Sequence, residues 1–267
     1  MPYYWQQLSG QFDFIAVRKW RLGNGDKQSS IDVQMDYWNL EVKCSLEYIH
    51  AMEVGKKLLD AIAKSDPSSR FPIETGNNVL AAVKVMIEPR YGEGDRIDGA
   101  DMLPPGTRRW CGDVEPLPNG KDRYDAWMKG MQSISTDEKS AAIRSMRNVN
   151  SSEVSSSSSD SAFYADDGKA GGGATAIICW QPSLAAFGPS GGYIPPHVGL
   201  AHELIHALHY LTGTAIRTRQ EEENLTVGCG KVGNKSFDTT NVGDLPEICE
   251  NRFRAELKLP LTTEYKL

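Results

Sequence analysis

The sequence contains His202-Glu203-Leu204-Ile205-His206 within a longer run that extends from Pro195 to Gly213. Paired prolines at the start of this run and a glycine at its end are typical of the two ends of an α-helix. At about 100° per residue, the histidines at positions 202, 206 and 209 share one face, and the leucines at positions 200, 204, 208 and 211 lie roughly opposite. We therefore predict a helix that buries its leucines and presents its histidines to a cleft.

The two histidines of the motif have the spacing of a zinc site. Side chains four residues apart lie on the same side of a helix, and neutral imidazole is a good zinc ligand, so His202 and His206 can bind one ion. Glu203 follows the first histidine directly, which places its carboxylate beside the metal, where it can accept a proton from a water molecule that zinc activates. The alternative is a surface helix with incidental histidines, and the continuous apolar back face argues against it. The sequence therefore predicts Zn²⁺ as cofactor and Glu203 as catalytic base.

Length and composition limit the classes of protein to which the chain can belong. Its 267 residues, 40% of them hydrophobic, are enough for one sizeable core, so we predict a single domain over residues 1–267. The net charge of −6 argues against a nucleic-acid-binding protein, which would present a basic face. No apolar run approaches the length of a membrane span.

The N-terminus and the cysteines indicate the cellular compartment in which the protein folds. The first residues contain neither the basic nor the apolar segment of a cleavable signal peptide. The five cysteines form no Cys-x-x-Cys pair, which favours reduced thiols over disulfides or a cysteine zinc site. We expect a protein that folds in a cytosol, and secretion into a host cell by a dedicated system would leave no mark in the sequence.

The first half of the chain contains no chemical motif, and its elements are predicted from apolar patterns alone. Three segments that alternate or run apolar predict strands, at residues 12–17, 31–37 and 79–87. Two segments with helical spacing predict helices, at residues 46–64 and 124–146. A stretch rich in proline and glycine predicts a loop over residues 99–119.

A change of composition marks the middle of the chain. Residues 149–173 are rich in serine and then in glycine, and such a segment cannot bury a core, so we predict a flexible insertion there. Residues 174–180 are apolar and predict a strand shortly before the histidine helix. In zinc peptidases with this motif, such a strand often lies at the rim of the active site, where an extended substrate can add to it through backbone hydrogen bonds.

The motif supplies two protein ligands, whereas a catalytic zinc ion takes three and a water molecule. His209 is on the right face but lies about 4.5 Å further along the helix axis than His206, at 1.5 Å per residue, so we expect it to line the cleft instead. The metzincin pattern would need a glycine at position 209 and a histidine at position 212, and the chain has His209 and Thr212. Glutamates remain as candidates, either in the run Glu221–Glu223 or at Glu250.

Three segments follow one another in the C-terminal part of the chain: Leu200–His209, the acidic segment Glu221–Gly228 and Glu250–Tyr265. In this order they resemble the NleD-type zinc metallopeptidases, which are type III effectors of pathogenic bacteria and their relatives. The same order is similar, more distantly, to clostridial neurotoxin light chains, which have His-Glu-Leu-Ile-His, then Glu-Glu-x-x-Thr-Phe-Gly, then Arg-x-x-Tyr. The resemblance covers about residues 170–267. We expect an α+β, zincin-like fold with an HExxH active-site helix and a small mixed sheet.

The resemblance implies a complete metal site. Aligned on Thr226, the second glutamate of the neurotoxin segment corresponds to Glu223, which would be the third metal ligand of a gluzincin-like site. Glu222 would support the ligands from the neighbouring position. We expect His209 and Glu250 to lie outside the ligand set as well, as further supports of the site.

The resemblance also implies groups that act on the substrate. Tyr265 is present where the family has a tyrosine, and its hydroxyl is the candidate donor to the developing oxyanion. The arginine expected three residues earlier is replaced by Thr262. Arg254 is therefore the candidate to polarise the substrate carbonyl, and without a substitute the activity would be reduced or absent.

We expect a zinc-dependent endopeptidase that hydrolyses a peptide bond in a protein substrate, in the form of a secreted effector or toxin that acts on a host protein. NleD-type effectors cleave host mitogen-activated kinases, so the resemblance implies a host kinase as substrate class. Two alternatives stay open: a catalytically weak or inactive zinc-binding interaction module, and a zinc hydrolase of a small molecule. A closed site with four protein ligands would favour the module, and an open water position would favour an enzyme.

Overall fold

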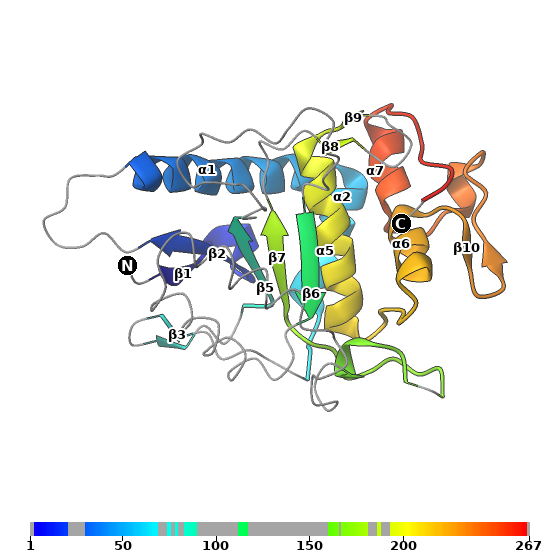
Figure 1. The fold of residues 1–267 in the computed structure, drawn as a ribbon, viewed down its shortest axis with the longest axis horizontal. Helices are drawn as coiled ribbons and strands as arrows, with labels where there is room; N and C mark the ends of the chain where they lie inside the picture. The colour runs from blue at the N-terminus through cyan, green and yellow to red at the C-terminus, as the bar shows by residue number, and fades with distance from the viewer. Residues whose placement is uncertain are drawn as a thin grey trace, which may run out of the picture.

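The computed structural model describes residues 3–20, 30–68, 74–75, 78–79, 83–89, 112–116, 160–165, 167–180, 186–187 and 193–265. Within these residues the chain forms a small mixed sheet with helices packed against it (Figure 1). The predicted α+β class with a small mixed sheet is therefore confirmed.

The main sheet has five strands in the order β1-β2-β5-β7-β6. Its strands are β1 (Tyr3–Gln7), β2 (Ile15–Trp20), β5 (Val85–Pro89), β6 (Gly112–Pro116) and β7 (Ala176–Trp180). The three inner strands run parallel to one another, and the two outer strands, β1 and β6, run antiparallel to their neighbours. The described residues also form three short antiparallel pairs: β3 (Glu74–Thr75) with β4 (Asn78–Val79), β8 (Ala186–Phe187) with β9 (Tyr193–Ile194), and β10 (Lys231–Val232) with β11 (Lys235–Ser236).

The described α-helices are α1 (Ser30–Ala51), α2 (Glu53–Lys64), α5 (Pro196–Thr212), α6 (Arg219–Val227) and α7 (Glu250–Glu256). Short 3₁₀ turns are η1 (Gly10–Phe12), η3 (Asp160–Ala162) and η4 (Val242–Asp244). The first three helices, α1, α2 and α5, contact one another, and α5 also contacts β6 and β7, while α6 and α7 pack against α5. None of the described helices is long and apolar enough to cross a membrane.

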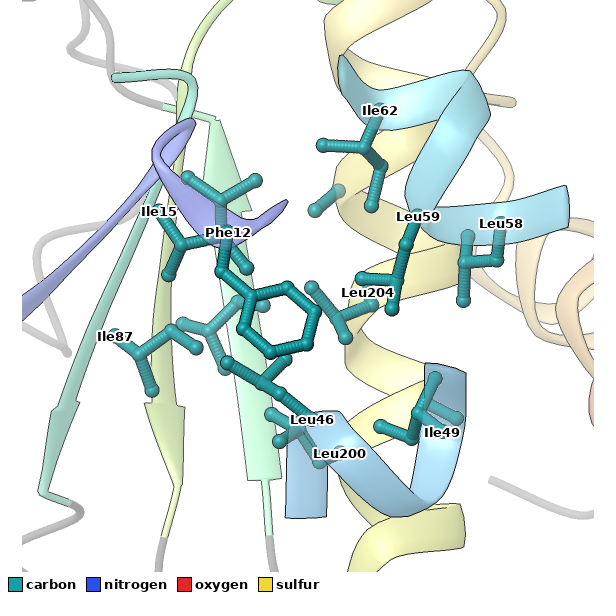
Figure 2. Packing of buried hydrophobic residues seen from close by; sticks show 14 of the residues in the cluster. Phe12, Ile15, Leu46, Ile49, Leu58, Leu59, Ile62, Ile87, Leu200 and Leu204 are labelled. Atoms are coloured by element: carbon teal, nitrogen blue, oxygen red, sulfur yellow. The ribbon is translucent and has the colours of Figure 1, made fainter. Parts of the chain in front are cut away.

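The core lies between the sheet and the first three helices. Successive side chains of a strand point to opposite faces, and in β2 Ile15 and Val17 join the large cluster with the helices while Ala16 joins a smaller cluster on the other face. The strands β5 and β7 show the same alternation. Figure 2 shows apolar side chains from the helices filling the space in front of the strands, among them Leu46, Leu59 and Leu204.

Two predictions for the N-terminal helices are wrong. Residues 31–37, predicted as a strand, belong to α1, because their short alternation continues without a turn residue into the helical spacing of the buried Trp38, Val42 and Leu46. The predicted helix over 46–64 is interrupted at Met52, whose φ of −86° and ψ of 145° are extended. An added Cβ on Gly55 would lie 1.8 Å from the carbonyl oxygen of an α1 residue, so the break brings the two helix backbones into contact.

Two other predictions meet the described residues in part, and a third lies outside them. The predicted loop over 99–119 contains β6, because pairing with β7 orders a segment whose glycine and proline indicated a loop. The predicted strand over 79–87 corresponds to the end of β4 and most of β5. The predicted helix over 124–146 lies outside the described residues.

The predicted strand over 174–180 is confirmed as β7. Just before it, the second part of the segment 149–173 contacts the end of α5, since Gly171 N donates to Gly213 O at 2.8 Å and Ala215 N donates to Ala162 O at 3.2 Å. Residues 149–159 lie outside the described residues. The flexibility of 149–173 and the single domain over 1–267 therefore stay predictions.

The end of α7 turns the chain back on itself at Lys258. This exposed lysine has φ of +56°, in the left-handed region that glycine usually occupies. Two backbone hydrogen bonds close the turn, from Lys258 N to Ala255 O at 3.1 Å and from Leu259 N to Arg254 O at 2.8 Å. This is the Schellman pattern, with lysine in place of glycine.

We expect Lys258→Gly to raise the free energy of unfolding by about 1 kcal/mol, because glycine avoids the cost of roughly 1–2 kcal/mol of a left-handed Cβ but loses more entropy on folding. Chemical denaturation would measure it. The matched control is Lys56→Gly in α2, which should lower the same free energy by about 1 kcal/mol. An equal loss of stability in both variants would contradict the left-handed turn.

Candidate metal centre

The helix α5 forms where the sequence predicts it. It begins at Pro196 and ends before Gly213, whose φ of +67° and ψ of 24° form a left-handed cap. Leu200 and Leu204 have no exposed surface and face the core. His202 and His206, on the opposite stripe, are 1% and 5% exposed, so both imidazoles are held in the interior.

Three potential ligand atoms converge beside α5. The Nε2 atoms of His202 and His206 lie 3.1 Å apart, and Glu223 Oε2 lies 3.3 Å and 3.4 Å from them. Glu223 Oε2 is buried and accepts no hydrogen bond from the described residues, and these three side chains form a group that could hold a metal ion. Two imidazole nitrogens and a carboxylate oxygen are the donors of one class of catalytic zinc site, so the residues fit the predicted ion.

The acidic run of α6 distributes its three carboxylates over different directions. Successive helical residues point about 100° apart. Glu221 accepts a hydrogen bond from Gly233 N at 2.8 Å, Glu222 contacts the far side of the His206 ring, and Glu223 faces the two Nε2 atoms. Only the last of the three points toward the centre of the group.

Glu222 contacts two histidines of α5, His206 and His209, and orients the ring of His206. His206 Nδ1 and His209 Nδ1 lie 2.9 Å and 2.7 Å from Glu222 Oε1, and Ile216 N donates to Glu222 Oε2 at 2.8 Å. When His206 Nδ1 donates to this carboxylate, its Nε2 lone pair is free to bind a metal. His209 belongs to this outer group and not to the group formed with Glu223.

Glu250 has the same relation to the other histidine. His202 Nδ1 lies 2.8 Å from Glu250 Oε2, and Arg254 Nε donates to Glu250 Oε1. Glu250 and Arg254 are 2% and 3% exposed. The buried Glu250 carboxylate on α7 therefore connects the Arg254 guanidinium to the His202 imidazole on α5. Glu250 and Arg254 are four residues apart on α7, so this ion pair lies within one helix.

The carboxylates and imidazoles shift one another's proton affinities. Burial opposes charge on His206, but Glu222 and Glu223 raise its pKa to about 9, and Glu223 and Glu250 likewise raise the pKa of His202. Burial raises the pKa of Glu222, Glu223 and Glu250, but the neighbouring histidines outweigh it and hold the pKa of all three carboxyl groups below the usual range. A divalent cation would take the place of the protons that these groups share without a metal.

Two further predicted residues lie next to the ligands. Glu203, 2% exposed, follows His202 on α5. The Tyr265 ring stacks on the His202 ring, with centroids 6.4 Å apart and planes 19° apart. Burial and the charges of Glu223, Glu203 and Glu250 raise the pKa of the Tyr265 hydroxyl well above its ordinary value, so the hydroxyl keeps its proton.

None of the described contacts of Arg254 and Thr262 involves the proposed ligand atoms. Arg254 binds Glu250 and donates from Nη1 to Pro260 O at 3.2 Å. Thr262, 2% exposed, is held through its backbone by Asn251. The catalytic role of Arg254 stays a prediction, and its geometry favours a supporting role.

Asn251 and Gln220 were missed by sequence reasoning. Asn251 has no exposed surface, and Gln220 Nε2 donates to Tyr265 O at 2.8 Å. Gln220 lies outside the three segments of the resemblance, and Asn251 lies within the third without a role assigned to it, because the partners of both amides are backbone atoms further along the chain. The position of Asn251 directly after Glu250 was the one available signal.

Comparisons with known proteins give a family match and similar solved structures. The family model described as "Peptidase_M91: Effector protein" matches residues 114–265, more than half of the chain. A search of curated proteins found no match. Among solved structures, the botulinum neurotoxin serotype C1 light chain protease is similar at 16% identity and a TM-score of 0.40, over 78% of this chain and 48% of that chain. This chain thus spans about half the length of that protease.

Proposed function

Because the chain belongs to the Peptidase_M91 family of effector proteins, we propose that it is a zinc-dependent endopeptidase of the zincin-like, gluzincin type. The family match confirms the resemblance to NleD-type peptidases and supports a metallopeptidase-like effector. The observation that supports the finer proposal is the convergence of two imidazole nitrogens and one carboxylate oxygen beside Glu203.

In this proposal His202, His206 and Glu223 hold the metal, and the carboxylates of Glu222 and Glu250 orient the imidazoles. Each Nδ1–H donates to its own glutamate, so each Nε2 presents a lone pair in a fixed direction. Zinc held in this way supplies a Lewis acid that makes water more acidic and polarises a carbonyl oxygen.

Glu203 and Tyr265 act on the reacting groups. The Glu203 carboxylate accepts a proton from the attacking water and passes it to the leaving amine, which is general base and then general acid catalysis by one group. The Tyr265 hydroxyl, kept protonated by burial and by the neighbouring carboxylates, donates to the oxyanion of the tetrahedral intermediate.

The sheet offers one edge near this site for an extended substrate. The strand β7, which the sequence suggested for this role, is paired on both sides, by β5 and by β6, and cannot accept another strand. The outer strand β6 contacts α5 and is the last strand in the order of described strands. We propose that a protein substrate adds to β6 through backbone hydrogen bonds.

We further propose that the substrate is a host protein, with a host kinase as the class that the family resemblance implies, and that a dedicated system secretes the protein into the host cell. The membership in an effector family supports these proposals. Nucleic acid is no part of the proposed function, given the net charge of −6.

The proposal predicts one equivalent of zinc in the purified protein and none in a His202→Ala/His206→Ala double variant, which retains a single ligand of the three. Metal analysis by mass spectrometry would measure both. Host-cell extract treated with the zinc-loaded protein should gain new peptide N-termini, and a chelator should abolish them. Equal zinc content in the two proteins would contradict the proposal.

An inactive zinc-binding module is the alternative that Thr262 favours, because Arg254 is bound to Glu250 and Pro260 instead of facing the ligands. The same experiment separates the two functions. A module would bind zinc and lose it in the double variant, but would produce no new N-termini in any extract.

A further inference from the structure

The C-terminal segment, residues 259–265, has no helix or strand, yet it places an aromatic ring against a proposed metal ligand. After the turn at Lys258 the segment runs back along α7, since Pro260 O accepts from Arg254 and Thr262 pairs with Asn251, one turn nearer the start of the helix. Beyond Leu259, no backbone–backbone hydrogen bond among the described residues holds this segment, so side chains from elsewhere fix its course.

Asn251 makes the central contact with this segment. Its Nδ2 donates to Thr262 O at 2.8 Å, and its Oδ1 accepts from Thr262 N at 2.8 Å. The side-chain amide thus pairs with both backbone groups of one residue, as a neighbouring strand would. The same Nδ2 also donates to Gly228 O at 3.2 Å, so the amide joins the segment to the end of α6.

A second amide holds the far end of the segment. Gln220 Nε2 donates to Tyr265 O at 2.8 Å, from a position three residues before Glu223 on α6. Asn251 directly follows Glu250 on α7. The two helices that supply Glu223 and Glu250 therefore also hold the segment that carries Tyr265.

We propose that Asn251 is a positioning residue for the reaction, whose amide sets the place of the Tyr265 hydroxyl by holding Thr262. The inference rests on the proposed function, in which this hydroxyl donates to the oxyanion. Both bonds go to the backbone of Thr262, so they form with any side chain at that position. The segment thus keeps its course although the arginine of the related sequences is absent.

The test uses Asn251→Asp, which retains the acceptor but removes the donor and places a carboxylate against two carbonyl oxygens. We expect this repulsion to detach Thr262 from the side chain, which gives faster hydrogen exchange at the Thr262 amide in the metal-free protein. Zinc content should be unchanged, and kcat should be lower by about 10²-fold, the loss that a small misplacement of a catalytic group produces. The matched control is Asn241→Asp at the N-cap of η4, an exposed amide that also accepts from a backbone N–H and lies outside the site.

A double-mutant cycle with Tyr265→Phe separates positioning from general destabilisation. If Asn251 acts through the tyrosine, Asn251→Asp costs little further activity once the hydroxyl is gone. Full addition of the two losses, or unchanged exchange at Thr262, would overturn the proposal. Should Asn251→Asp not fold, Asn251→Ala removes both contacts with Thr262 without adding a charge, and the same cycle decides. The exchange measurement needs no activity, so it stands even where the peptidase proposal fails.

Discussion

Replacing Glu203 with glutamine is expected to lower kcat by about 10²–10⁴-fold, the range in which a positioned general base contributes. Glutamine has the shape of glutamate but cannot accept the proton of the attacking water at neutral pH. The side chain is 2% exposed and follows a proposed metal ligand, so the isosteric change keeps the local packing. Turnover of a confirmed protein substrate by the zinc-loaded variant would measure the effect.

The matched control for this prediction is Glu221→Gln. It makes the same change of charge on α6, where the carboxylate binds Gly233 N at an exposed position. We expect wild-type zinc content in both variants and wild-type turnover in the control alone. Wild-type turnover by Glu203→Gln would show that the proton is taken by another group and that the proposed mechanism is wrong.

The elements that the sequence predicts well have strong local signals. The helix α5 combines a 3.6-residue period with proline at one end and glycine at the other, and the structure agrees at both ends. The strand β7 is continuously apolar and lies inside the sheet, paired on both sides. Local pattern and tertiary environment favour the same structure in these two segments.

The predictions fail where tertiary contacts decide. Residues 31–37 alternate like a strand, but they extend a helix whose buried face is set by Trp38 and Val42. The strand β6 has glycine and proline at its ends and becomes a strand through pairing with β7. No period in the sequence distinguishes these outcomes, because the deciding partner lies elsewhere in the chain.

The candidate site likewise has residues that the local sequence predicts and residues that only tertiary contacts bring together. The spacing of His202 and His206 is local, so the sequence could place both. Glu222, Glu223 and Glu250 meet them only when α6 and α7 pack on α5. The family motif therefore had to select Glu223, and the segment that contains Asn251 gave no sign of what its amide binds.

Glu223→Gln is expected to weaken zinc binding more than any other single glutamate substitution in the chain. In the structure Glu223 Oε2 lies 3.3 Å and 3.4 Å from the two Nε2 atoms and has no hydrogen-bond donor of its own among the described residues. An amide oxygen is a much poorer zinc ligand than a carboxylate, so the variant would retain two good ligands of three. Competition with a chromogenic chelator would measure the zinc affinity.

Glu222→Gln is the matched comparison, one residue earlier on the same helix. Its carboxylate binds His206 Nδ1 and His209 Nδ1 and faces away from the ligand atoms. Losing such an outer partner costs roughly 10–100-fold in metal affinity. We therefore expect a measurable but smaller loss than in Glu223→Gln.

Glu250 is the remaining competitor for the third ligand position, and its surroundings decide against it. One oxygen binds His202 Nδ1 and the other binds Arg254 Nε, so neither is free to face the Nε2 atoms. Glu250→Gln would leave a buried arginine without its anion and should destabilise the fold as well as the site. A zinc-bound crystal structure with the Glu250 carboxylate about 2.0–2.2 Å from the ion, or a Glu223→Gln variant that binds zinc as tightly as Glu222→Gln, would overturn the assignment of Glu223.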